Sequence, residues 1–443
     1  MPASNRSNRT GQASRSSLDS LNESNASEVP TENRRKLLLQ MIKALMKYGA
    51  PSHRIQEYAS VLFKMCDLEG FVNYNMGGTQ IFASQLIPPC CPNAANIFQF
   101  TNTRDRTTYT ELVQEQGLDL GASDAAFRIY KLVTTREMTI DDANERLAAL
   151  LASPSYYKPW VKVPFYGLSS SFICVWAFGG SWLSMVPSLI LGTVSGIFQE
   201  ILPFRIQNRP ILLQISSAVV ITFLARAFAS IHGGEYFCFD AIGISAVVNI
   251  LPNYDMLRGV LEMTNPQTMS VGATRLTYTI IYSLFLGYGA DIGSQLWRRI
   301  DGVDIVCSHS AIDPKLLILM VPVSLVWMAV KIGSRPRQMP AQVLLGSTTF
   351  VVQYFVKRFA DRNIAVTITA FTLGTLGNLY MRLLDEFAFG AMISGVFILL
   401  PSGVSVDGGL SANVLDVLIG LAVGMYLSVL VVYPKYRSHL FCF

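Results

Sequence analysis

The chain has 443 residues, of which 51% are hydrophobic and only 15% are charged, whereas soluble proteins carry closer to a quarter charged residues. Residues 1–160 contain 33 charged side chains and residues 161–443 only 32, so charge is depleted in the longer part. This pattern excludes a single soluble globule and a disordered or fibrous chain, and a dispersed net charge of +5 gives no basis for nucleic-acid binding.

The N-terminal third divides into a tail and a small domain. Residues 1–33 are rich in Ser, Asn and Arg and nearly lack aromatic side chains, so we predict a disordered tail. Residues 34–160 have the pattern of a soluble α/β domain. Apolar residues at helical spacing predict a helix over 37–46, and Ser52 is expected to be the N-cap of a second.

The middle of this domain has a strand pattern. Residues 71–76 and 79–84 flank Gly77-Gly78 and predict a hairpin, with a third strand at 97–100. Thr139 is expected to cap the last of the three helices that follow. These helices are predicted at 108–117, 123–134 and 139–152.

Ten apolar runs follow Trp160, and each has about the length that a helix needs to cross a bilayer core of about 30 Å. We therefore predict an α-helical polytopic membrane protein with about ten transmembrane helices, five in residues 161–302 and five in 303–443. The runs are 163–179, 182–202, 210–230, 236–252, 270–290, 314–331, 339–357, 363–382, 386–402 and 412–433.

The two sets of five helices have similar segments. Residues 239–252 align with 388–401, so that Ser245 matches Ser394 and both segments end in Leu-Pro. Because five is odd, two such copies run in opposite senses across the membrane, and two inverted five-helix repeats are typical of transporters. Chance similarity between apolar helices is the alternative explanation.

Charged residues within apolar helices usually face a pathway or a partner. Arg226 is the best candidate and has a counterpart in Arg382, while Arg275 is placed to bind a substrate carboxylate, and Asp240 is a further ionisable candidate. The alternative is that arginines near helix ends reach the headgroups and that the aspartate caps a helix.

The two Leu-Pro corners are the second candidate constellation. Proline breaks a helix and frees carbonyl groups that can bind a polar solute. Ordinary helix ends stopped by proline are an equal alternative. The polar and proline residues of the two corners are Ser245, Asn249, Pro252, Ser394, Pro401 and Ser402.

Loops on the side of the N-terminal domain hold more basic residues than those on the other side, so both termini are predicted to be cytoplasmic. The pattern does not distinguish the plasma membrane from an endomembrane. The seven cysteines form no metal or disulfide pattern, and we expect reduced thiols, no metal and no cofactor.

Four ionisable residues in the small domain, His53, Arg54, Glu57 and Asp67, lie on or near one helix. A solvent-exposed polar face is the commoner explanation for such a group. A hydrolase with His53 and Glu57 as its acid/base pair is the alternative from the enzyme class.

Several of these residues resemble the threonine/serine exporter family, in particular its fungal branch, the pheromone-regulated membrane proteins. Gly49, Ser52, Arg54 and Glu57 look like the opening motif of the family. The segment from Asp240 to Leu251-Pro252 and the later Gly272-x-x-Arg275 look like its membrane motifs, although Asn253 stands where the family has glycine.

The resemblance implies a non-enzymatic, proton-coupled exporter of threonine and serine or of related small carboxylates, with a cytoplasmic N-terminal domain. Its expected partners are the small-molecule substrate, protons and the lipid bilayer. The sequence leaves open a homo-oligomer and a non-transporting scaffold in mating or cell fusion.

Overall fold

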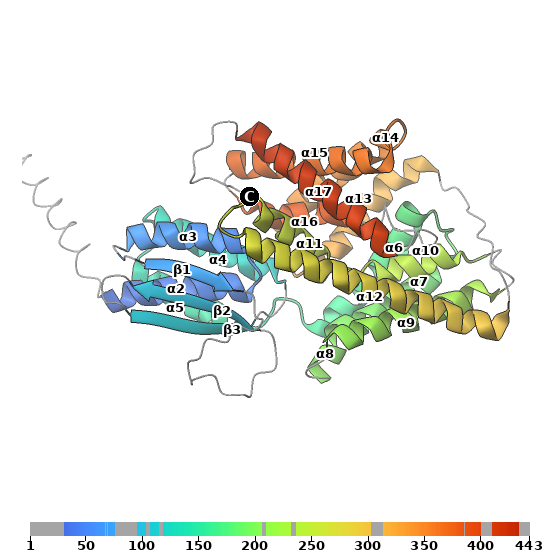
Figure 1. Cartoon of the computed structure of the whole chain (residues 1–443), viewed down its shortest axis with the longest axis horizontal. Helices are drawn as coiled ribbons and strands as arrows, with labels where there is room; N and C mark the ends of the chain where they lie inside the picture. Colours follow the sequence, from blue (N-terminus) through green and yellow to red (C-terminus); the bar gives the residue numbers. More distant parts are fainter. Residues whose placement is uncertain are drawn as a thin grey trace, which may run out of the picture.

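In the computed structural model, the N-terminal helices and a sheet lie at one end of a bundle of long helices (Figure 1). The elements carry the labels of Figure 1, in chain order from α2. The described residues are 31–66, 68, 70–75, 95–102, 107–114, 118–205, 210–231, 236–302, 313–384, 386–399 and 410–433.

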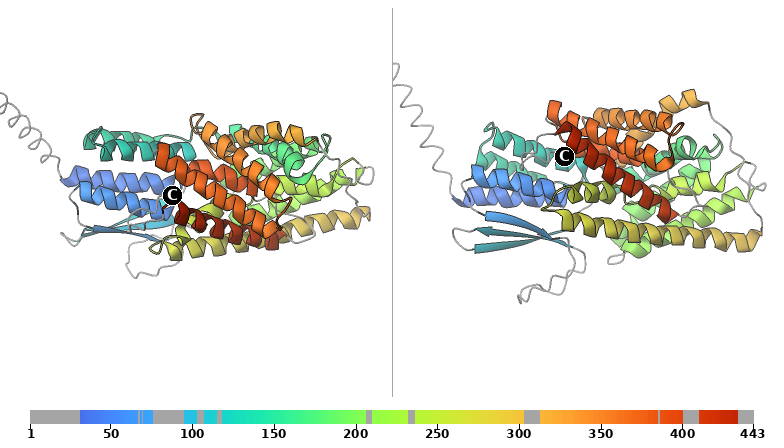
Figure 2. Two further views of the ribbon diagram at one scale, coloured as in Figure 1. Left: turned by 90° about the horizontal axis from the view of Figure 1, so that it is seen from above. Right: turned by 45° about the horizontal axis from the view of Figure 1, so that its top comes forward.

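Among the described residues of the N-terminal part there are four helices and one sheet. The helices bury a core of leucine, methionine and tyrosine side chains that includes Leu37, Met41 and Tyr58, and the sheet lies along one side of them (Figure 2). The elements are α2 (Thr31–Lys47), α3 (Ser52–Met65), β1 (Gly70–Asn75), β2 (Ala95–Asn102), β3 (Thr107–Gln114), α4 (Leu120–Thr134) and α5 (Ile140–Ala152).

The sheet is antiparallel with the order β1-β2-β3. β1 pairs with β2, so that Phe71 lies opposite Thr101, whereas the predicted hairpin partner 79–84 lies outside the described residues. The helix predicted at 108–117 is wrong, because residues 107–114 form β3. This segment contains three threonines and a valine, whose branched side chains favour a strand paired along β2.

Of the three helix starts compared with the prediction, one confirms it and two correct it. The hydroxyl of Thr139 accepts a hydrogen bond from the Asp142 N–H at 3.2 Å, which confirms it as a cap. Ser52, however, is the first residue of α3, and its cap is Pro51. Helix α2 begins at Thr31, so the last three residues of the predicted tail are helical.

Each of the ten predicted apolar runs overlaps a helix. Among the described residues, four helices are long and apolar enough to cross a membrane: Pro159–Phe178, Leu212–Ala229, Arg362–Leu384 and Val414–Val432. The helices of the bundle are α6 (Pro159–Phe178), α7 (Met185–Glu200), α8 (Leu202–Arg205), α9 (Pro210–Ala229), α10 (Phe239–Val247), α11 (Asn253–Met263), α12 (Met269–Asp301), α13 (Pro314–Lys331), α14 (Met339–Val356), α15 (Arg362–Leu384), α16 (Ala388–Leu399) and α17 (Leu410–Val432).

The predicted run 236–252 is interrupted. Its helix α10 has 9 residues and, at about 1.5 Å per residue, is too short to cross a bilayer core. A second helix, α11, starts after Pro252, which lacks the N–H that would continue a helix. The sequence did not predict α11, because Arg258 and Glu262 interrupt its apolar pattern although both side chains are buried.

Glycine pairs bring two helix pairs into close contact. A Cβ atom on Gly293 of α12 would lie 2.3 Å from the Val219 carbonyl of α9, and one on Gly424 of α17 would lie 2.6 Å from the Thr367 carbonyl of α15. Each glycine ends a G-x-x-x-G segment that begins four residues earlier, the pattern with which membrane helices approach closely.

We therefore expect Gly424→Val to destabilise the protein by about 1–3 kcal/mol, because the added side chain meets backbone that cannot rotate away. The measurement is equilibrium unfolding in mixed detergent micelles. The exposed neighbour on the same helix supplies the control, Val423→Leu, which should have no effect. Equal stability of both variants would contradict this close packing.

Not all cysteines are reduced, contrary to the prediction. Cys66 and Cys174 are free, but Cys238 is disulfide-bonded. Cys238 immediately precedes α10. The preceding segment is joined to the last turns of α12, because Trp297 donates a hydrogen bond to Ser230 at 3.1 Å, and that end of α12 lies away from α2–α5 (Figure 1). Whether a cysteine forms a disulfide depends on how the fold brings distant residues together, and the spacing of cysteines in the sequence does not indicate this.

Candidate functional site

Lys331, the last residue of α13, is a buried cation inside the bundle, with 5% of its surface exposed. Its ammonium group lies 4.9 Å from the ring centre of Tyr166 and 4.8 Å from that of Phe397. Within the described part of the chain, no carboxylate forms a salt bridge with it. A buried cation among membrane helices, without a salt bridge to a described carboxylate, marks a candidate functional site.

The polar groups around Lys331 come from the break after α10 and from α6. Lys331 Nζ donates to Asn249 Oδ1 at 2.7 Å, and Asn249 Nδ2 donates to Ser170 Oγ at 2.6 Å. Ser169 Oγ also reaches Asn249 Oδ1 at 3.4 Å. These neutral groups can hydrogen-bond an anion held by the ammonium group, so we name Tyr166, Ser169, Ser170, Asn249 and Lys331 the lysine cluster.

Ser245 and Ser394 occupy corresponding places in the two halves of the bundle. The Ser245 hydroxyl of α10 lies 3.2 Å from that of Ser188 on α7. The Ser394 hydroxyl of α16 donates to the Gln342 carbonyl of α14 at 2.7 Å. Only Ser245 adjoins the lysine cluster, because its carbonyl accepts a hydrogen bond from Ser170 at 3.2 Å.

The two arginines that were predicted to correspond, Arg226 and Arg382, have different environments in the structure. Arg226 on α9 is partly buried, donates to Ser294 of α12 at 3.1 Å and lies over the Phe239 ring. Asp240, the residue after Phe239, is half-buried in the first turn of α10. Arg382, its expected counterpart, is exposed at the end of α15. Pro401 and Ser402 lie outside the described residues.

Arg275 belongs to a second cluster, at the junction with the N-terminal helices, in which Arg258, Glu262 and Arg275 are buried. Its Nε donates to Glu262 Oε2 at 3.0 Å, and Arg258 Nε donates to Glu262 Oε1 at 3.2 Å. A further bond at 2.9 Å joins Arg275 Nη1 to Asp255. Burial alone would raise the pKa of Glu262, but the charges of Arg275 and Arg258 hold it below the ordinary value.

The N-terminal motif completes this junction cluster. The Ser52 N–H donates to Glu262 Oε1 at 2.9 Å, and the Tyr254 hydroxyl donates to the Gly49 carbonyl. Gly49 has a φ of +84°, and a Cβ there would collide with that hydroxyl, so only glycine suits the turn. Two motifs far apart in sequence, at Gly49–Ser52 and at Arg275, therefore meet at one carboxylate.

The other two motif residues also face the bundle. Arg54 is 2% exposed, pairs with Glu57 at 3.0 Å and reaches the Met381 sulfur of α15 at 2.9 Å. Burial raises the pKa of Glu57, and the neighbouring Arg54 charge opposes that rise. The expected solvent-exposed polar face is therefore wrong for His53 and Arg54, and Glu57 pairs with Arg54 rather than with His53.

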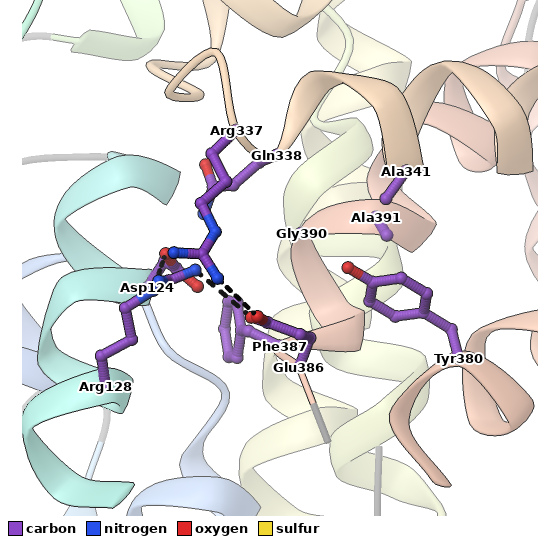
Figure 3. A pocket seen from close by; sticks show the side chains of 10 residues that line it. All are labelled: Asp124, Arg128, Arg337, Gln338, Ala341, Tyr380, Glu386, Phe387, Gly390 and Ala391. Carbon is purple, nitrogen blue, oxygen red and sulfur yellow. Dashed lines mark hydrogen bonds and ion pairs between the residues drawn. The ribbon is translucent and has the colours of Figure 1, made fainter. Parts of the chain in front are cut away.

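The junction also contains an ionic pocket between α4, α15 and α16 (Figure 3). Glu386 accepts from Arg128 of α4 at 3.3 Å and from Arg337, which precedes α14, at 3.2 Å. Nearby, the Gly121 N–H of α4 donates to the carbonyl of Gly333, two residues after Lys331, at 3.1 Å. The N-terminal helices thus contact the bundle beside the lysine cluster.

Two central residues, Lys331 and Glu262, are not predicted by the sequence pattern. Lys331 ends an apolar run and counts as a loop charge, because nothing in its neighbours shows that the side chain turns inward. Glu262 lies in a segment without clear periodicity, and its partners are Ser52 and two arginines of α11 and α12. A helical plot of 253–263 would have found Arg258 and Glu262 on one face, four residues apart.

The chain resembles known proteins along most of its length. A family model described as "Putative threonine/serine exporter" matches residues 36–297. An uncharacterized protein of Schizosaccharomyces pombe is 34% identical and covers 93% of this chain and 57% of its own length. Pheromone-regulated membrane protein 10 of Debaryomyces hansenii is 32% identical over 92% of this chain and 43% of its own length.

The same-named protein of Saccharomyces cerevisiae is 31% identical over 92% of this chain and 55% of its own length. The chain thus spans about half the length of the curated relatives it matches. No solved structure matches it. The match to the family model confirms the resemblance found in the motifs, and the chain belongs to the threonine/serine exporter family of membrane proteins.

Proposed function

We propose that this chain is a secondary transporter that exports threonine, serine or a related small carboxylate, coupled to protons, and that the lysine cluster binds the solute. The observation that carries the proposal is Lys331, a buried cation with hydrogen-bonding neighbours and no salt bridge to a described carboxylate. An ammonium group attracts a substrate carboxylate, while Asn249 and the two serines supply partners for its remaining polar groups.

Discontinuous helices support this proposal. Transporters commonly bind their solute where helices break within the membrane. Asn249 lies in the break between α10 and α11, and Phe397, which packs on Lys331, belongs to the 12-residue α16. The break after α10 thus contributes Asn249 to the lysine cluster, and the short helix α16 packs Phe397 against Lys331.

Ten membrane helices in two inverted repeats, with a cytoplasmic α/β domain, form the architecture that we propose. The second helices of the two halves, α7 and α14, share methionine, glycine and glutamine at the same spacing, namely Met185, Gly192 and Gln199 beside Met339, Gly346 and Gln353. The third and fifth helices of each half pack closely through glycine, α9 on α12 and α15 on α17. Both similarities support an internal repeat.

The disulfide of Cys238 supports an orientation with the N-terminal helices in the cytoplasm. Disulfides persist in oxidising compartments and are rare in the cytosol. Cys238 immediately precedes Phe239, whose ring lies by Arg226 and thus near Ser294 in the last turns of α12. That end of α12 lies away from α2–α5 (Figure 1). The opposite end, with those helices, is then the cytoplasmic one.

Counterflow in proteoliposomes tests the function. Vesicles with the full chain are loaded with threonine, serine or succinate and assayed with and without an imposed proton gradient. Exchange of one solute, changed by the gradient, is the expected result. No exchange of any of the three, from protein shown to be folded and inserted, would contradict the proposal and favour a membrane scaffold.

Arg226 supplies a separate prediction. Its guanidinium joins α9 to α12 beside α10, so we expect Arg226→Ala to abolish counterflow while the protein remains folded and inserted. Arg382→Ala is the control, because that arginine is exposed at the end of its helix. Full exchange in Arg226→Ala would exclude this arginine from the pathway.

A further inference from the structure

The ionic pocket at the junction is small and lined mainly by polar groups. Its volume is about 50 Å³, which suits a group of a few atoms. It lies between α4, the start of α14, the end of α15 and the start of α16, and the Tyr380 hydroxyl is directed into it (Figure 3). None of the described residues that line this pocket belongs to the lysine cluster.

Two guanidinium groups from different elements share one carboxylate there. Arg128 Nη2 donates to Glu386 Oε2 at 3.3 Å, and Arg337 Nη2 donates to Glu386 Oε1 at 3.2 Å. A carboxylate that gives one oxygen to each of two arginines is bound as a free carboxylate ligand would be. The fourth charged group, Asp124, is already engaged by Arg128 Nε at 2.8 Å.

Glu386 can leave this position at little cost. Its side chain is 30% exposed, and those of Arg128 and Arg337 are 32% and 70% exposed, so water screens both ion pairs and neither holds the carboxylate strongly. Glu386 also precedes α16 and is not held within a helix. Glu262, 0% exposed between its two arginines, has no such freedom.

We propose that Arg128 and Arg337 form a binding site for a small carboxylate at the junction of the N-terminal helices and the bundle, and that Glu386 occupies this site as an internal substitute for the ligand. The ligand accepts hydrogen bonds from both arginines and from the Tyr380 hydroxyl, and the Glu386 side chain rotates into solvent. Its binding separates Glu386 from α4, so the site links a dissolved carboxylate to the contact between the N-terminal helices and α16.

The test uses Glu386→Gln in the full-length chain, with acetate as the probe. Glutamine keeps the size of the side chain but removes the competing charge, so acetate should bind on the order of tenfold more tightly. The readout is the acetate concentration that half-protects an introduced Ala341→Cys thiol from a thiol reagent, because Ala341 lines the pocket and is only partly buried. Chloride at equal ionic strength controls for screening.

Arg128→Ala and Arg337→Ala should each remove the protection, and the exposed Glu145→Gln on α5 should leave it unchanged. A second readout is the midpoint of thermal unfolding, which acetate should raise most in Glu386→Gln. If Glu386 is only a structural contact, its replacement leaves acetate binding absent or no tighter. That result, or equal protection by chloride, would overturn the proposal.

Discussion

Glu262→Gln is expected to lower the free energy of unfolding by about 3–5 kcal/mol, because it leaves two buried guanidinium groups without their shared counter-charge. Glu262 is 0% exposed and holds Arg258, Arg275 and the Ser52 N–H on two oxygens. The measurement is equilibrium unfolding of the full chain in mixed detergent micelles. Glu145→Gln, an exposed change of the same kind, should have no effect.

The same cluster predicts a pH dependence. The pKa of Glu262 lies below its ordinary value of 4.5. Its contribution to stability is therefore complete above that pH and is lost as the pH falls through the lowered pKa. Glu262→Gln should lack this part of the acid sensitivity. A variant as stable as wild type, with the same acid profile, would show that the cluster contributes nothing to the junction.

Lys331→Met is expected to reduce counterflow by about a hundredfold or more, because it removes the charge that holds the substrate carboxylate. Methionine retains the length of the stem between the Tyr166 and Phe397 rings, and replacing a buried charge by an apolar group of similar volume is commonly neutral or stabilising. Loss of transport should therefore occur in a protein of unchanged or higher stability.

The control for this variant is on the same helix. Lys315→Met changes an exposed lysine in the first turn of α13 and should leave counterflow unaltered. Asn249→Asp gives a second check, because a fixed carboxylate beside Lys331 would compete with the substrate and also suppress exchange. Counterflow at the wild-type rate in Lys331→Met would exclude the lysine cluster as the solute site.

Sequence alone predicts the features that depend on local pattern. Thr139 at the start of α5 and the apolar runs that overlap α6, α9, α15 and α17 follow from capping and hydropathy. The prediction fails at 107–114, because a short polar segment with branched residues becomes a strand only when β2 pairs with it. Whether a charged side chain is buried also depends on its neighbours in space.

The arginines illustrate the same limit within the candidate sites. Arg226 and Arg382 occupy similar positions in the pattern, yet one bridges two helices and the other is exposed. Arg275 was expected to face a substrate, but its partners Glu262 and Asp255 lie 13 and 20 residues away along the chain, in another helix. No periodicity relates these residues, so the pairing emerges only with the fold.

The shared carboxylate of Glu262 has a consequence for how such proteins can be recombined. Gly49 and Ser52 on one side and Tyr254 and Glu262 on the other form a single interface. A chimaera that joins the first 150 residues of one relative to the helices of another would inherit only half of that interface. The N-terminal segment and the helical bundle are then expected to exchange successfully between relatives only when both partners of each contact are transferred together.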